Sequence, residues 1–112
     1  MNRDKAYLLD IAHFAETILQ LTSEMDEKQF RADLRTQLAV SYELSVLGEA
    51  VKRLSLEFRQ SYPEIPWRSM AGMRDKLIHD YDGVLVERIW EVVSDHIPKL
   101  LDTIAPLLPR ES

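Results

Sequence analysis

The sequence contains no cysteine, only three glycines and five prolines, and no long apolar run. Without cysteine the chain can form neither a disulfide framework nor a thiolate metal site, and this composition fits a reducing compartment. So few glycines and prolines cannot supply the many turns of a β-sandwich or β-barrel. No stretch approaches the length of a membrane span and no signal peptide follows Met1, so we expect a cytoplasmic protein.

Basic residues are also in deficit, because 14 Lys and Arg oppose 19 Asp and Glu and leave a net charge of -5. Proteins that bind nucleic acid non-specifically usually have the opposite sign, since phosphates attract a basic surface. A nucleic-acid role therefore requires a local basic cleft. The cations that could line one are Arg31, Arg35, Lys52, Arg53, Arg68 and Lys76.

What the chain does have is an abundance of helix formers and apolar residues at helical spacing. Its 112 residues fit one domain spanning residues 1–112. The spacing predicts four helices, over about 4–21, 30 or 33 to 59, 67–80 and 86–108. We therefore expect an all-α, antiparallel four- to five-helix bundle, in which dimerisation would help a domain this small.

Several residues have specific structural roles in this prediction. Asp4 is expected to cap the first helix, and Gly48 to allow close approach of a neighbouring helix. Pro98 should kink the last helix or leave one carbonyl unpaired, and the tail from Pro109 should fray. The inward face of the second helix is expected to carry Leu34, Leu38 or Ser41, Leu44, Gly48, Val51, Ser55 and Phe58.

The residues best suited to catalysis lie between Arg74 and Tyr81. Asp75 and His79 are four residues apart on a helix and share a face, and the long Arg74 side chain can reach the same edge. A guanidinium matches phosphate oxygens, and an imidazole moves protons near neutral pH. The alternative is a surface helix with an Asp–His pair and a solvated arginine. Residue types alone favour that alternative.

The stretch Arg-Asp-Lys-Leu-Ile-His-Asp-Tyr at 74–81 resembles the Arg-x4-His-x-Tyr motif of the HepT-like branch of the HEPN superfamily. The sequences GEAVKRLS (48–55) and YPEIPWR (62–68) resemble other signatures of that family, and the resemblance covers most of residues 30–105. It implies a HEPN-like helical bundle that dimerises and cleaves RNA without a metal or other cofactor. Arg74 and His79 would be the catalytic pair, with Asp75 at the polar position after the arginine.

The same resemblance implies a toxin–antitoxin pair. The partner would be an MntA-type nucleotidyltransferase antitoxin, which silences the toxin by transferring AMP to Tyr81. The substrate would be RNA, with tRNA as one candidate.

Cleavage of RNA by its own 2′-OH needs a base, an acid and a cation, whereas one chain offers a single histidine in the motif. A two-fold dimer could present two copies of the motif in one cleft, which makes a composite site the expected arrangement. Two carboxylates in the motif, Asp75 and Asp80, oppose RNA binding there. Position 75 is often Asn in such motifs. Glu49 either orients a motif residue or is an ordinary exposed glutamate.

Two other functions are compatible with the sequence. The chain could be a non-catalytic helical subunit that docks a nucleotidyltransferase, or a plain dimeric scaffold. Trp67 and Trp90 are expected to be core or interface anchors rather than platforms for base stacking. His13 and His96 have no ligand spacing to another histidine, so we expect no metal site.

Overall fold

A computed structural model describes residues 2–108, which fold into helices with no strand, as the all-α prediction requires. The helices are α1 (Asn2–Leu21), α2 (Glu27–Arg31), α3 (Leu34–Arg53), α4 (Leu56–Ser61), α5 (Trp67–His79), α6 (Val86–Glu91) and α7 (Ile97–Ile104), with short helices η1 (Tyr81–Gly83), η2 (Val92–His96) and η3 (Ala105–Leu107). Within this described part, no helix combines the length and apolarity needed to cross a bilayer. The tail expected to fray, residues 109–112, lies outside it.

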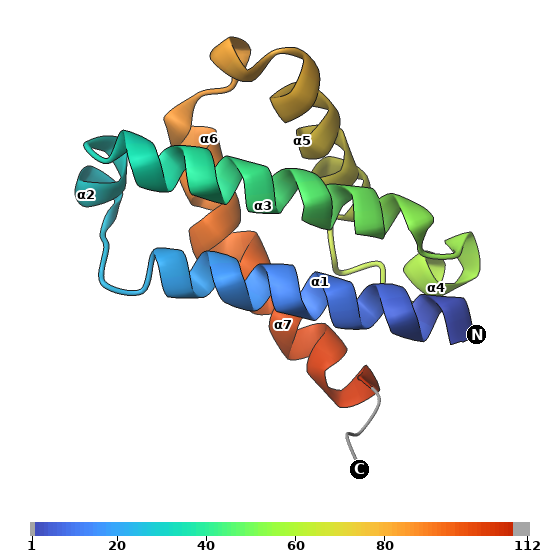
Figure 1. Ribbon diagram of the computed structural model, residues 1–112. Helices are drawn as coiled ribbons and strands as arrows, with labels where there is room; N and C mark the ends of the chain where they lie inside the picture. Colours follow the sequence, from blue (N-terminus) through green and yellow to red (C-terminus); the bar gives the residue numbers. More distant parts are fainter. Residues whose placement is uncertain (1, 109–112) are drawn as a thin grey trace.

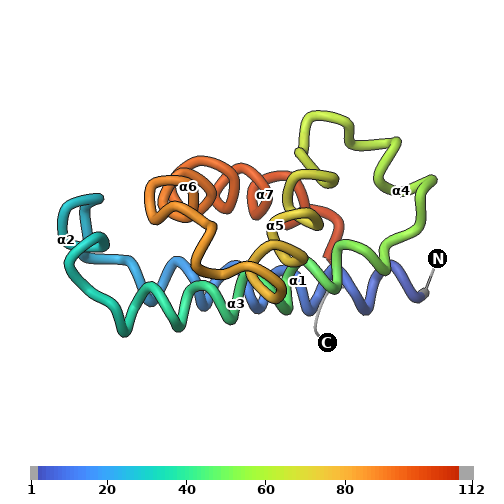
Figure 2. Tube along the Cα trace, turned by 90° about the horizontal axis from the view of Figure 1, so that it is seen from above, coloured from blue at the N-terminus to red at the C-terminus, as the bar shows by residue number. Residues whose placement is uncertain are grey.

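Helices α1 and α3 run antiparallel and side by side along the long axis of the molecule, which measures 41 × 30 × 21 Å (Figure 1). Helix α5 crosses α3, and α7 packs against α1 (Figures 1 and 2). The residues that recur at helical spacing along one side of α1 and just after it are all buried, namely Leu8, Ile11, Ala15, Ile18 and Thr22. The side of α1 that packs against the other helices is therefore the one marked by apolar spacing in the sequence.

The second predicted helix is in fact two helices, because the backbone is extended at Leu54 and Ser55. The carboxylate of Asp4 accepts hydrogen bonds from the Ser55 amide (2.8 Å) and the Ser55 hydroxyl (2.7 Å), and that hydroxyl in turn accepts from the Phe58 amide (3.1 Å). Asp4 therefore supports the start of α4 instead of capping α1, and that prediction was wrong. Burial raises the Asp4 pKa, but the Ser55 hydrogen bonds outweigh burial and the pKa is lowered.

The inward face of α3 also differs from the prediction at its start. Leu34 and Leu38 are 62% and 50% exposed, so their assignment to the core was wrong. The buried residues there are Gln37 and Ser41, the second of which was the stated alternative to Leu38. The Gln37 amide donates to the carbonyls of Phe30 (2.8 Å) and Arg31 at the end of α2, which rotates α3 and turns the leucines outward.

The last predicted helix is continuous from α6 to α7 but contains a π-helical turn at Val92–His96. Pro98 is the second residue after this turn and cannot donate a backbone hydrogen bond to the preceding turn. The structure thus has a local widening of the helix just before Pro98, where a kink or an unpaired carbonyl was predicted.

Candidate active site

Gly48 sets the distance between α3 and α5. A Cβ atom on Gly48 would lie 2.5 Å from the Cβ of Arg74 and 3.0 Å from the carbonyl oxygen of Met70. The two helices therefore touch at the backbone of α3, which confirms the predicted close approach. This contact lodges the base of the Arg74 side chain between the helices, and only 24% of that side chain is exposed.

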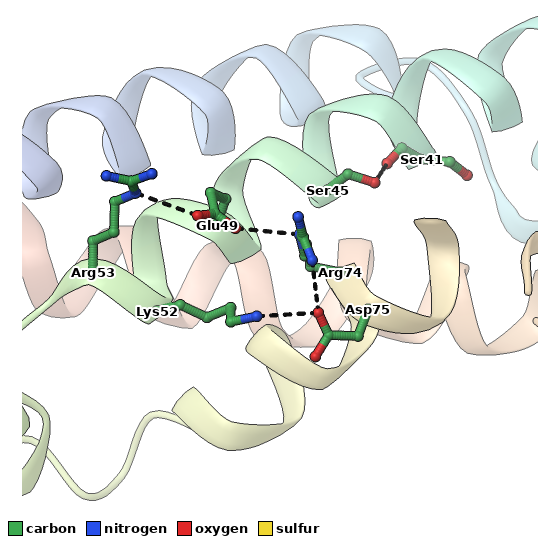
Figure 3. A network of polar contacts seen from close by, with 7 residues as sticks. All are labelled: Ser41, Ser45, Glu49, Lys52, Arg53, Arg74 and Asp75. Carbon is green, nitrogen blue, oxygen red and sulfur yellow. Dashed lines mark hydrogen bonds and ion pairs between the residues drawn. The ribbon is translucent and has the colours of Figure 1, made fainter. Parts of the chain in front are cut away.

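Two carboxylates hold the guanidinium of Arg74 (Figure 3). Nη1 donates to Asp75 Oδ1 at 2.9 Å, and Nε lies 3.3 Å from Glu49 Oε1. The second contact is an ion pair without the alignment of a hydrogen bond, so the buried Nε–H has no hydrogen-bond acceptor among residues 2–108. Arg74 is thus anchored from its own helix and from α3.

Two further cations continue the network on α3 (Figure 3). Lys52 Nζ lies 3.2 Å from Asp75 Oδ1, and Arg53 Nε lies 3.3 Å from Glu49 Oε2. The hydrogen bonds from Arg74 and then Lys52 lower the pKa of Asp75, which keeps it ionised at neutral pH. Three cations face two carboxylates, so the network keeps a surplus positive charge despite Asp75.

The contacts of Arg74 engage Nε and Nη1, and Nη2 takes part in none of the ion pairs within residues 2–108. The Nη2 group is therefore left to donate to an anion, and guanidinium N–H groups pair well with phosphate oxygens. The arrangement is therefore suited to binding a phosphodiester.

His79 lies outside this network. It is the last residue of α5 and is exposed. On an α-helix five residues correspond to about 7.5 Å along the axis and about 140° around it. The structure thus brings Arg74 and Asp75 together with Glu49, whereas the His79 side chain makes no hydrogen bond or ion pair within the described chain. Its expected partner Asp75 is instead bonded to Arg74 and Lys52.

Tyr81 lies in η1, just after α5, where it is half-buried against the core. Asp80 has its carboxylate folded over Gly83, where a Cβ would collide with it. The second acidic residue of the motif is therefore turned into the η1 bend.

Glu49 is the residue whose role the sequence left open. The structure resolves the choice toward an orienting residue, because the Glu49 carboxylate bridges Arg74 and Arg53. The available signal was its place next to Gly48, where the backbone of α3 touches α5. Within residues 2–108 no group of three or more acidic or histidine side chains is placed to bind a metal ion.

An apolar stripe runs along the exposed side of α3 toward this site. Leu34, Leu38 and Tyr42 follow one another at four-residue intervals and are 62%, 50% and 65% exposed. Tyr42 and Glu49 are seven residues apart, two helical turns, so the stripe and the Arg74 network share one side of α3. Ile78, one turn after Arg74 on α5, is also 51% exposed.

Comparison with known proteins identifies the family. The profile "Ribonuclease HepT-like" matches residues 11–107. A protein of Thermococcus cleftensis named "Probable ribonuclease HepT" is 48% identical over 96 residues, which cover 86% of this chain and 87% of that protein. Two relatives whose names include the word RNase come from Methanocaldococcus jannaschii (40% identical, covering 93% of this chain and 86% of the relative) and Caldanaerobacter subterraneus subsp. tengcongensis (36% identical, covering 99% of each). No solved structure matches the chain significantly. The chain therefore belongs to the HepT-like ribonuclease family.

Proposed function

We propose that this chain is a metal-independent endoribonuclease and the toxin of a toxin–antitoxin pair. Family membership supports ribonuclease activity, with RNA as the substrate. The observation that carries the mechanism is the anchored guanidinium of Arg74, held by Glu49 and Asp75 with Nη2 left for a phosphate.

The reaction would be an internal transesterification. A histidine base removes the proton of the ribose 2′-OH, and the 2′-oxygen attacks the adjacent phosphorus. The P–O5′ bond then breaks, and an acid protonates the leaving 5′-oxygen, which leaves a 2′,3′-cyclic phosphate and a 5′-hydroxyl. Arg74 would stabilise the charge of the phosphorane, and His79 would transfer the protons.

The active site in this proposal is shared by two subunits. Arg74 and His79 project from different sides of α5, and one chain supplies a single motif histidine for two proton transfers. The stripe of Leu34, Leu38 and Tyr42 is apolar, exposed and directed at the Arg74 network, which fits coverage by a second copy of the chain. A two-fold axis near Glu49 would bring the same groups of both copies to one cleft.

Regulation would act through Tyr81. It lies two residues after His79 and is half-exposed, so a partner nucleotidyltransferase of the MntA type could transfer AMP to its phenol. Each AMP would add a phosphate charge and a base beside the RNA site, which would repel and block the substrate.

Purified chain incubated with total RNA in EDTA tests the enzymatic proposal. We expect cleavage to 2′,3′-cyclic phosphate ends, abolished in His79→Ala, and growth arrest when the chain is expressed alone. Co-expression with the nucleotidyltransferase should add AMP-sized increments to the intact mass, and Tyr81→Phe should remove them. A chain that is harmless, binds the transferase and tolerates His79→Ala would instead be a docking subunit.

A further inference from the structure

Most cations near the proposed active site are occupied by carboxylates. Arg31 pairs with Glu27 and Glu87, and Lys52 and Arg53 pair with the two carboxylates that hold Arg74. These residues were expected to provide a basic cleft, but their charge is largely neutralised. The positive surface that an RNA would need must therefore lie elsewhere on a chain of net charge -5.

Two adjoining depressions on the outer side of α5 supply such a surface. The first, of about 400 Å³, lies between α5, η1 and α6, and its charged lining residues are Lys76 and Arg88. The second, of about 590 Å³, lies between α4, the following linker and the start of α5, and its charged lining residues are Arg59 and Arg68. Helix α5 lies between α4 and α6 (Figure 2). The two depressions meet on α5, because both are lined by Ser69.

Neither depression is lined by a carboxylate, although acidic residues outnumber basic ones in the chain. By contrast, a neighbouring depression beside α6 is lined by Glu27, Glu87 and Glu91. The separation of charge is therefore local, and it leaves one continuous basic track along α5. We define the basic track as the two depressions together.

The cations of the basic track are available to an anion. Arg59, Arg68 and Lys76 take part in none of the ion pairs within residues 2–108. Arg88 is shared, because one nitrogen pairs with Glu91 outside the track and another lies 3.0 Å from the Ser69 hydroxyl. Ser69 thus holds Arg88 at the junction of the two depressions.

The remaining lining is apolar. Met73, Val84 and Leu85 line the first depression, and Leu56 and Ile65 the second. The first depression is open at Gly72, since a Cβ there would meet no atom within 4 Å. Alternation of cations with apolar surface matches single-stranded nucleic acid, whose phosphates are anionic and whose bases have apolar faces.

The track leads to His79. Gly72 and His79 are seven residues apart, so both lie on the same side of α5, about 10 Å apart along its axis. Lys76 lies between them along the helix, on the neighbouring side. We propose that the basic track binds the single-stranded RNA that flanks the scissile phosphate. This inference rests on the proposed ribonuclease function, because it identifies where that substrate lies.

The test uses His79→Ala chain, which should bind RNA without cleaving it, and a fluorescein-labelled single-stranded RNA. Reversing two track cations (Arg68→Glu with Lys76→Glu) should weaken binding by about tenfold or more. It should also flatten the slope of log affinity against log salt concentration by about 0.7 for each phosphate that the chain no longer neutralises. The matched control reverses two exposed lysines on other helices, Lys28→Glu with Lys99→Glu, and gives the same net charge. It should change binding by less than about threefold.

Two uncharged substitutions of Gly72 separate the effect of the track's shape on RNA binding from the effect of its charge. Gly72→Met should fill the first depression and weaken binding, whereas Gly72→Ala should leave binding unchanged because its methyl group meets nothing. Thermal unfolding of each variant checks that the fold is intact.

The outcomes separate this inference from the proposed function. Equal weakening by the track and control reversals would overturn the track and leave cleavage by the unsubstituted chain standing. So would unchanged RNA binding combined with lost binding of the nucleotidyltransferase, since the track would then be a protein interface. RNA binding through the track without any cleavage by the unsubstituted chain would support the track and overturn the nuclease proposal.

Discussion

Replacing Gly48 with alanine is the most direct perturbation of the geometry that holds Arg74. The added methyl carbon would lie 2.5 Å from the Arg74 Cβ and 3.0 Å from the Met70 carbonyl oxygen. Neither atom can move without its backbone, so α3 and α5 must separate. Overpacking of this kind costs about 1–3 kcal/mol, and the higher helix propensity of alanine returns about 1 kcal/mol.

Gly72→Ala is the matched control. Gly72 is also inside a helix, neither glycine has a positive φ, and a methyl group on Gly72 meets no atom within 4 Å. Only the propensity gain applies, so this variant should be stabilised by about 1 kcal/mol. The two alanine variants should therefore differ by about 1–3 kcal/mol, or roughly 4–12 °C in melting temperature for a chain of this size.

Urea unfolding followed by circular dichroism measures this difference, and RNA cleavage by the same samples measures its effect on Arg74. We expect Gly48→Ala to lose most of its cleavage activity at a temperature where it is still folded. If Gly48→Ala proved as stable and as active as Gly72→Ala, the close contact would not position Arg74 and the reasoning would be refuted.

Three further predictions concern separate parts of the chain. Glu49→Gln should lower kcat because Arg74 loses an anchor, and should lower KM because a carboxylate is removed beside the phosphate site. The control is Glu43→Gln on the same helix. Equal kcat and KM values for the two variants would contradict the prediction. Asp4→Asn should lower the free energy of unfolding by about 1–3 kcal/mol at neutral pH. Because the folded pKa of Asp4 is lowered, its contribution is complete above the ordinary aspartate pKa of 3.8 and disappears as the pH falls through the folded pKa. The variant and the unsubstituted chain should therefore converge in acid. As a control, Asp10→Asn removes an exposed carboxylate and should leave the free energy of unfolding at neutral pH unchanged. Leu38→Lys with Tyr42→Lys should give monomers in sedimentation experiments. Leu56→Lys, at a residue of similar exposure that lies off the stripe, should leave the dimer intact. A dimer that survives the double substitution would rule out the stripe as its interface.

The sequence predicted local features well where helical spacing alone decides them. The inward residues of α1 and the irregularity near Pro98 follow from periodicity and from proline chemistry. Gly48 was also interpretable, since a glycine inside a long helix usually has a packing reason.

The failures involve contacts between separate helices. The break before α4 depends on Asp4, which reaches Ser55 across 51 positions of sequence. The outward turn of Leu34 and Leu38 depends on the Gln37 amide binding the end of α2. Periodicity cannot reveal either contact, because both satisfy backbone groups at helix ends rather than apolar faces.

The candidate site shows the same division. Arg74, His79 and Tyr81 could be selected from the motif, but the anchoring of Arg74 by Glu49 needed the crossing of two helices. The cations expected to form a basic cleft include Lys52 and Arg53, which the structure pairs with carboxylates instead. Which cations remain open, Arg68 and Lys76 among them, depends on the arrangement of helices.

The central claim is that Arg74 of one subunit works with His79 of another, and mixing inactive chains tests it most directly. Arg74→Ala and His79→Ala chains, each inactive alone, are unfolded together and refolded as an equimolar mixture. Half of the dimers then contain one of each, and their shared cleft keeps one intact Arg74 and one intact His79 from different subunits. The account predicts that part of the activity returns in the mixture, although neither chain is active alone. A mixture that forms mixed dimers yet stays inactive would contradict it.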